Sequence, residues 1–192
     1  MKLRTIICLL FLPVISLWAY QDIDWSHETQ NISVSCLNPE NGLSHAKVSS
    51  SYRDEFGRVW IGTDDGLNCY NGNRIDIFRP DGRNQSITTN SITGLCGDGQ
   101  GHLFIKGRQS LSVLDFRNMK FSVLEDNDVR AFCFCNGILY YVCGNEVFSC
   151  MSSGDYKTKT FTYTPKHNEV ITDICIDRDG AIYLSLSSDE LR

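Results

Sequence analysis

Carboxylates are the first residues in this sequence that could do chemistry, because aspartate can ligate metals and act as a general acid or base. Asp54, Asp98 and Asp177 each lie in a short glycine-containing turn, and Asp64 stands beside Asp65. The first three occupy the same turn of different repeats, so we expect them to lie far apart. Calcium needs about six to eight oxygens at one place, so no calcium site is predicted. The Asp64–Asp65 pair is interpreted as a solvated turn.

Histidine, cysteine and glycine patterns also lack the spacing that chemistry requires. The histidines are scattered, and Cys133-Phe134-Cys135 lacks the spaced second pair of a zinc site. The glycine-rich run from Gly97 to Gly101 leads into a strand, whereas a phosphate cradle needs a helix N-terminus. The sequence therefore predicts no catalytic residue, no cofactor and no metal, and it leaves the ligand-binding residues unknown.

The candidate residues are positioned by a repeat that starts at Val48, Ile92, Val129 and Ile171. In three copies the first aliphatic residue is followed six positions later by Asp, nine later by Gly and twelve later by an aromatic residue. The copy at Val129 lacks the Asp and is one residue shorter. A period of about 40 residues made of short strands is typical of a β-propeller. The repeat motif comprises Asp54, Gly57, Trp60, Gly62, Asp98, Gly101, Phe104, Gly137, Tyr140, Asp177, Gly180 and Tyr183.

We predict an all-β fold of four-stranded antiparallel blades in an incomplete ring of about three and a half blades. A closed propeller needs ~4–8 blades, so we expect this chain to be the N-terminal piece of a longer protein; the alternative is four small blades that close. The expected segments are a signal peptide (1–19), an N-terminal segment (20–45), blade one (46–79), blade two (80–125), blade three (126–164) and a truncated blade four (165–192). The alternating run Ile32–Leu37 is expected to be a ring-closing strand.

Side chains that recur at one strand position are expected to fill the protein interior. Trp60, Phe104, Tyr140 and Tyr183 share a position, and packing between blades is favoured over a platform for stacking sugars. The sequence has nine cysteines, and three of them recur four residues after a repeat start, which favours mostly free, buried thiols. A hairpin at Gly144-Asn145 would place Cys143 opposite Glu146, which disfavours a disulfide between Cys143 and Cys150.

The first residues are typical of a secretory signal. Lys2 and Arg4 precede an apolar run from Ile6 to Trp18, and Ala19 is the candidate last residue removed. The alternative is a membrane anchor, but the run of about 13 residues is short for that role. The net charge of −5 disfavours a nucleic-acid partner. We therefore expect the mature chain to be exported.

Residues 41–78 closely resemble the two-component regulator propeller repeat. The resemblance rests on Gly42–His45, Asp54–Gly57, Val59–Thr63, Asp65–Asn68 and Tyr70–Gly72. It is degenerate over residues 91–186. The repeat is found in the periplasmic sensor region of hybrid two-component systems of Bacteroides-type bacteria.

The resemblance implies a ligand-sensing propeller, with a glycan fragment as ligand and no catalysis in this chain. It also implies partners: the remaining blades, a histidine kinase anchored at the inner membrane, and a homodimer in the full-length form. One alternative is a non-catalytic exported scaffold for protein interaction. The other is an exported propeller lyase or glycosidase, which would need converging carboxylates or a histidine cluster.

Overall fold

The computed structural model describes residues 34–82, 86–151, 157–166 and 169–188. The expected signal peptide at residues 1–19 lies outside this range. The chain divides into two compact units, Met1–Cys36 and Leu37–Arg192, and the second unit carries all of the described strands. Among the described residues, no helix is long and apolar enough to span a membrane.

The second unit is built of three antiparallel sheets of four strands and one of two strands. The first sheet comprises β1 (Val48–Arg53), β2 (Val59–Thr63), β3 (Gly66–Tyr70) and β4 (Ile75–Phe78). The second comprises β5 (Gly94–Gly97), β6 (His102–Lys106), β7 (Leu111–Asp115) and β8 (Lys120–Glu125). The third comprises β9 (Val129–Cys135), β10 (Ile138–Cys143), β11 (Glu146–Met151) and β12 (Thr158–Thr162). The last pairs β13 (Glu169–Ile176) with β14 (Ile182–Ser188).

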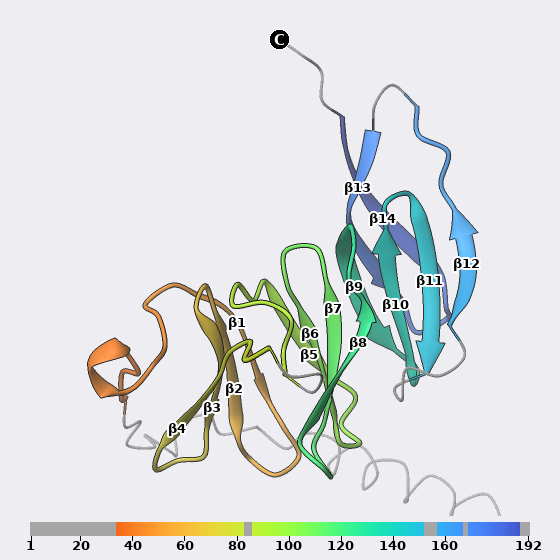
Figure 1. The fold of residues 1–192 in the computed structure, drawn as a ribbon. Coiled ribbons are helices and arrows are strands. Elements are labelled where there is room, and N and C mark those ends of the chain that lie inside the picture. The colour runs from red at the N-terminus through yellow and green to blue at the C-terminus, as the bar shows by residue number, and fades with distance from the viewer. Residues whose placement is uncertain (1–33, 83–85, 152–156, 167–168, 189–192) are drawn as a thin grey trace, which may run out of the picture. The chain divides into compact units, whose positions relative to one another are not determined.

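Each sheet is a meander in which neighbours in sequence are neighbours in the sheet. The first strands of successive sheets, β1, β5, β9 and β13, contact one another in that order (Figure 1). Short four-stranded sheets arranged side by side in this way are propeller blades. The predicted all-β propeller fold is therefore confirmed, with three complete blades and the first two strands of a fourth.

The core lies between the blades, because the strands of each sheet bury side chains on both faces. Trp60 and Leu67 of the first sheet pack with Leu103 and Leu114 of the second in one cluster. The second and third sheets share a cluster that contains Phe104, Val113, Leu139 and Tyr141. The third sheet meets β13 through a cluster that contains Ala131, Val142, Ile171 and Ile174.

The register repeats from blade to blade at the position four residues after each repeat start. Tyr52 pairs with Trp60, and the recurring cysteines pair with the recurring aromatic residues. These pairs are Cys96 with Phe104, Cys133 with Tyr140, and Cys175 with Tyr183. The sequence offsets thus correspond to one fixed place in each hairpin.

Side-chain volumes compensate between neighbouring first strands. In the second sheet Gly97 leaves room for the ring of Tyr52, since a Cβ there would lie 2.2 Å from Tyr52 Cζ. In the third sheet, Phe134 occupies the position that is equivalent to Gly97. In the second sheet, the position that is equivalent to Tyr52 holds the smaller Cys96. A large side chain on one strand is therefore matched by a small one on the next, as close packing requires.

Two expectations are corrected by the structure. Residues 34–37, the described part of the expected strand Ile32–Leu37, are not in a strand; the chain enters a short 3₁₀ turn, η1 (Pro39–Asn41), capped by Asn38. The seven described cysteines from Cys69 to Cys175 are free, but only Cys69 and Cys150 are buried. Cys175 is exposed because it lies on β13, beyond which the described residues provide no further sheet.

Candidate functional site

The repeated aspartates organise the turn between the first two strands of a blade. Asp54 Oδ1 accepts hydrogen bonds from the backbone N–H groups of Phe56 (3.0 Å) and Arg58 (2.9 Å). Asp54 Oδ2 accepts from Arg58 Nε (2.6 Å) and from Trp60 Nε1 (2.8 Å). All of these donors belong to the same hairpin, so this carboxylate is occupied in holding the hairpin closed.

The same arrangement recurs in the second and fourth blades. Asp98 accepts from the backbone N–H of His102 at 3.0 Å, and its second oxygen lies 2.7 Å from His102 Nδ1. Asp177 accepts from the backbone N–H of Ala181 at 2.8 Å and from the Tyr183 hydroxyl at 3.2 Å. Each aspartate bonds within its own turn, as predicted, and the three are not brought together.

Hydrogen bonding keeps the buried turn carboxylates charged. Burial alone would raise the pKa of Asp54, but hydrogen bonds from Trp60 and Arg58 hold it below its usual value. Burial also opposes ionisation of Asp98, and hydrogen bonds from Gln100 and His102 again lower its pKa. A carboxylate with a depressed pKa and no free access is suited to structure rather than to proton transfer.

The other motif residues shape or fill the blades. The turn glycines adopt positive φ, namely Gly57 (81°), Gly101 (108°), Gly137 (81°) and Gly180 (86°). Gly62 has another role, because a Cβ there would lie 2.6 Å from Ile92 Cγ2 of the next blade.

The recurring aromatic residues pack between blades where a following sheet is present. Trp60 and Phe104 are fully buried, and Tyr140 packs against the cluster shared with β13. Tyr183 is 58% exposed, on the two-stranded sheet. Packing between blades is thus confirmed for Trp60, Phe104 and Tyr140.

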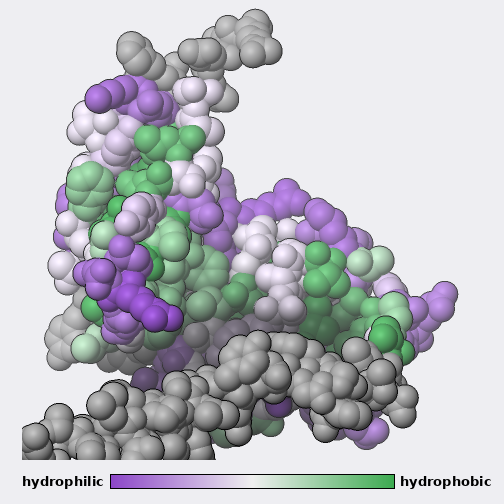
Figure 2. Space-filling view, turned by 180° about the vertical axis from the view of Figure 1, so that it is seen from behind, coloured by the Kyte–Doolittle hydropathy of each residue, from purple (hydrophilic) through white to green (hydrophobic). Residues whose placement is uncertain are grey.

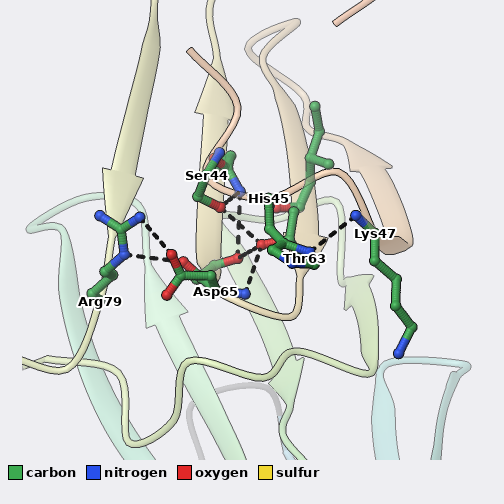
Figure 3. A network of polar contacts seen from close by, with 9 residues as sticks. Ser44, His45, Lys47, Thr63, Asp65 and Arg79 are labelled. Atoms are coloured by element: carbon green, nitrogen blue, oxygen red, sulfur yellow. Dashed lines mark hydrogen bonds and ion pairs between the residues drawn. The ribbon is translucent and has the colours of Figure 1, made fainter. Parts of the chain in front are cut away.

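A polar network occupies the opposite edge of the first blade, where β2 ends and β3 begins (Figure 3). Asn68 is fully buried, accepts from the Ser44 backbone N–H at 2.9 Å and donates to Ser44 Oγ at 2.8 Å. Thr63 Oγ1 lies 2.8 Å from Ser44 Oγ and donates to the Gly66 carbonyl at 2.9 Å. This network anchors the segment that precedes β1 to the blade.

The adjacent aspartates lie at this edge and are each ion-paired. Asp64 accepts from Lys47 Nζ at 2.8 Å, and Asp65 accepts from Arg79 Nη2 at 2.8 Å. These hydrogen bonds lower the pKa of both carboxyls. Sequence reasoning placed the two carboxylates in a solvated turn but missed both cations, which are 14 or more residues away.

The same edge continues across the second and third blades, and we call it the charged rim. The rim comprises the loops at the ends of β2 and β6 and the segments that lead into β1, β5 and β9. Two pockets open on it. One of about 360 Å³ is lined by Thr88, Thr89, Arg108, Gln109, Ser110 and Asp126. The other, of about 330 Å³, includes Thr93, Lys106, Arg130, Phe132 and Asp173 in its lining.

These pockets have the size of small-ligand sites, for which ~300 Å³ is the usual lower end. Their hydroxyl, cationic, carboxylate and aromatic groups can hydrogen-bond a polar ligand. Sequence reasoning left the ligand-binding residues unknown, because the lining comes from separate blades.

The described cysteines and histidines form neither a metal site nor a site with a reactive thiol. No group of three or more His, Cys, Asp or Glu residues among the described residues is placed to hold a metal ion. Burial raises the pKa of Cys69 to about 11 and also raises that of Cys150. The thiolate is the reactive form, so these two thiols are poor nucleophiles at neutral pH.

Comparison with known proteins shows similarity to one class of propeller. Residues 42–65 match the family described as "Two component regulator propeller", and this segment contains the Ser44–Thr63 contact and both ion-paired aspartates. The chain is 32% identical over 63 residues to "Histidine kinase P4" of Formosa agariphila, which covers 33% of this chain and 5% of the relative. The resemblance to the two-component regulator propeller repeat is therefore confirmed.

Solved structures of B. thetaiotaomicron proteins share the fold. The extracellular domain of a putative hybrid two component system aligns with a TM-score of 0.65 and 21% identity, over 78% of this chain and 23% of that one. The extracellular domain of a putative one component system aligns with a TM-score of 0.58 and 17% identity, over 73% of this chain and 20% of that one. The chain thus shares the propeller fold of the extracellular domains of these systems, and it spans about a quarter or less of their length.

Proposed function

We propose that this chain forms part of an exported, ligand-sensing propeller of a two-component system, and that its ligand is a carbohydrate-derived signal. The match of residues 42–65 to the two component regulator propeller family carries the proposal. It is supported by the fold shared with extracellular domains of such systems and by the pocketed rim of hydroxyl and charged groups.

The mechanism is binding rather than chemistry in this chain. The buried carboxylates of Asp54 and Asp98 are used within their own hairpins, and no reaction step is assigned to them. A ligand signals only if it binds one arrangement of the protein better than another. Binding at the rim would favour one arrangement of the blades, and a dimeric protein anchored at the inner membrane would pass this preference to a histidine kinase.

A binding screen on the complete exported portion of the protein tests this function. We expect one class of glycan fragment to raise the melting temperature and to give saturable heat in calorimetry, while unrelated sugars do neither. Combined substitution of the rim pockets, Arg108→Ala with Lys106→Ala, should weaken that binding. Saturable binding of a non-carbohydrate ligand alone would contradict the carbohydrate proposal, and release of a cleaved product would contradict the assignment to binding.

A further inference from the structure

Lys106 is a half-buried cation on the charged rim that pairs with no carboxylate of the described residues. Its side chain lies at the end of β6, and Nζ donates to the Gly107 carbonyl at 3.1 Å and to Thr93 Oγ1 at 3.3 Å. By contrast, Lys47, Lys157 and Lys159 each have a carboxylate oxygen within 2.9 Å.

Burial without a counter-charge has a cost that an anionic ligand could relieve. Burial lowers the pKa of Lys106, since it disfavours the charged ammonium. Both oxygen partners of Nζ are neutral, so the ammonium keeps a donor for a further acceptor. Lys106 borders the pocket of about 330 Å³ on the rim, and a negatively charged group there would complete its coordination.

The other walls of this pocket suit a sugar ring. Phe132 lies against the backbone of Gly94, where a Cβ would come within 2.9 Å of the ring, and offers an apolar surface. Asp173 is exposed, and one of its oxygens accepts from the Ile174 backbone N–H at 2.9 Å. A carboxylate in this position can accept hydrogen bonds from sugar hydroxyls, and aromatic rings commonly pack on the apolar face of a sugar.

The charges around this pocket favour a singly charged carboxylate over a doubly charged phosphate. Arg130 also lines the pocket, but its guanidinium is already paired with Asp128 at 3.1 and 3.2 Å. Asp173 also lines the pocket, so two carboxylates, Asp173 in the lining and Asp128 paired with Arg130, lie beside its two cations. A dianionic phosphate would be repelled by both aspartates, whereas one carboxylate directed at Lys106 would be accommodated.

We propose that this pocket binds a monosaccharide unit that carries a carboxylate, with the carboxylate on Lys106 Nζ, the hydroxyls toward Asp173 and Thr93, and the ring against Phe132. This inference rests on the proposed sensing function and narrows its ligand to acidic sugars. The site is formed by β5, β6, β9 and β13, which all lie within this chain.

Calorimetric titration of the complete exported portion of the protein with glucuronate, glucose and inorganic phosphate tests this site. We expect glucuronate to bind with a Kd of ~1 mM, because one charged contact and one ring contact give weak affinity. Glucose and phosphate should each bind at least about tenfold more weakly.

Variants assign the effect to Lys106. Lys106→Met keeps the aliphatic stem and should raise the glucuronate Kd at least about tenfold, while Lys106→Arg should retain most of the affinity. Lys47→Met is the matched control, because Lys47 lies on the same rim outside this pocket, and it should leave the Kd unchanged. Melting curves of all three variants establish that they are folded.

Several outcomes would overturn the inference. Equal glucuronate affinity in Lys106→Met, or equal affinity for glucose or phosphate in the parent chain, would show that Lys106 does not select a sugar carboxylate. Absence of glucuronate binding would do so as well. In each of these cases the glycan screen on the complete exported portion still decides the proposed sensing function independently.

Discussion

The indole N–H of Trp60 donates a hydrogen bond of 2.8 Å to the buried carboxylate of Asp54. The same ring stacks on Phe116 of the second blade, with ring centroids 5.3 Å apart. The Arg58 guanidinium pairs with Asp54 and lies 4.7 Å from the Phe116 ring centroid. A turn of the first blade and the interface with the second are thus stabilised by the same few side chains.

Removing Trp60 should show how much this interface contributes. Trp60→Ala is expected to lower the free energy of unfolding by ~3–5 kcal/mol, the usual cost of emptying a large aromatic core site. Tyr183→Ala is the matched control at the same repeat position, and it should cost under ~1 kcal/mol because Tyr183 is 58% exposed. Urea unfolding followed by fluorescence or circular dichroism measures both. Equal effects of the two changes would contradict packing between blades as the role of Trp60.

Loss of the Asp54 carboxylate should destabilise the hairpin even though no apolar contact is removed. Asp54→Ala leaves the Trp60 indole and the Arg58 guanidinium without their acceptor, and we expect a loss of ~3 kcal/mol in unfolding free energy. Glu55→Ala, an exposed change in the same turn, should cost under ~0.5 kcal/mol. Thermal melts of both variants make the comparison. If the two variants melt together, the carboxylate does not hold the turn.

Acid should destabilise the fold through the turn aspartates. The folded pKa values of Asp54 and Asp98 lie below the usual value, so the unfolded chain takes up these protons first as the pH falls. Their stabilisation is complete above the unfolded pKa of ~3.9 and is lost as the pH falls through the lower, folded values. Asp54→Asn should therefore show a shallower loss of stability between about pH 5 and pH 2 than the parent chain. Parallel slopes in a pH series of urea unfolding curves would contradict this account.

The match between Tyr52 and Gly97 can be tested by repacking. Gly97→Ala should destabilise by ~1–3 kcal/mol, because the new Cβ would lie 2.2 Å from Tyr52 Cζ. Adding Tyr52→Cys, which places in blade one the residue found in the other blades, should recover part of this loss. A double-mutant cycle from denaturant unfolding gives the coupling. Additive effects of the two changes would mean that these residues do not share one space.

The 192-residue chain is expected to self-associate and to show no hydrolase, lyase or kinase activity. Apolar side chains reach the surface on the face that carries β14, where Tyr183 is 58% and Leu186 is 41% exposed (Figure 2). Unpaired strand edges add to this tendency. We also expect no tight binding of oligosaccharides, because such sites on propellers draw loops from several blades. Size-exclusion chromatography with light scattering and calorimetry provide the measurements. A stable monomer with micromolar affinity for one glycan would contradict this expectation.

Local sequence patterns were enough to predict the blades and the pairing within each hairpin. The offsets from Val48, Ile92 and Ile171 place an Asp, a Gly and an aromatic residue at fixed points of a hairpin, and each of these three hairpins is present in the structure. The Gly144-Asn145 turn correctly placed Cys143 opposite Glu146. These features follow from local chain geometry, because strand alternation and turn residues act over a few positions only.

The role of each repeated position in its own surroundings could be read only from the packing of the blades. Trp60 and Tyr183 share a repeat position, yet one is buried and the other exposed, since burial depends on whether another sheet follows. Asp64 pairs with Lys47, whereas Lys106 on the rim pairs with no described carboxylate. Both outcomes likewise depend on loops from separate strands. The physical reason is that a repeat specifies contacts within a blade, whereas surfaces between blades are set by residues about 40 positions apart whose side chains differ from copy to copy.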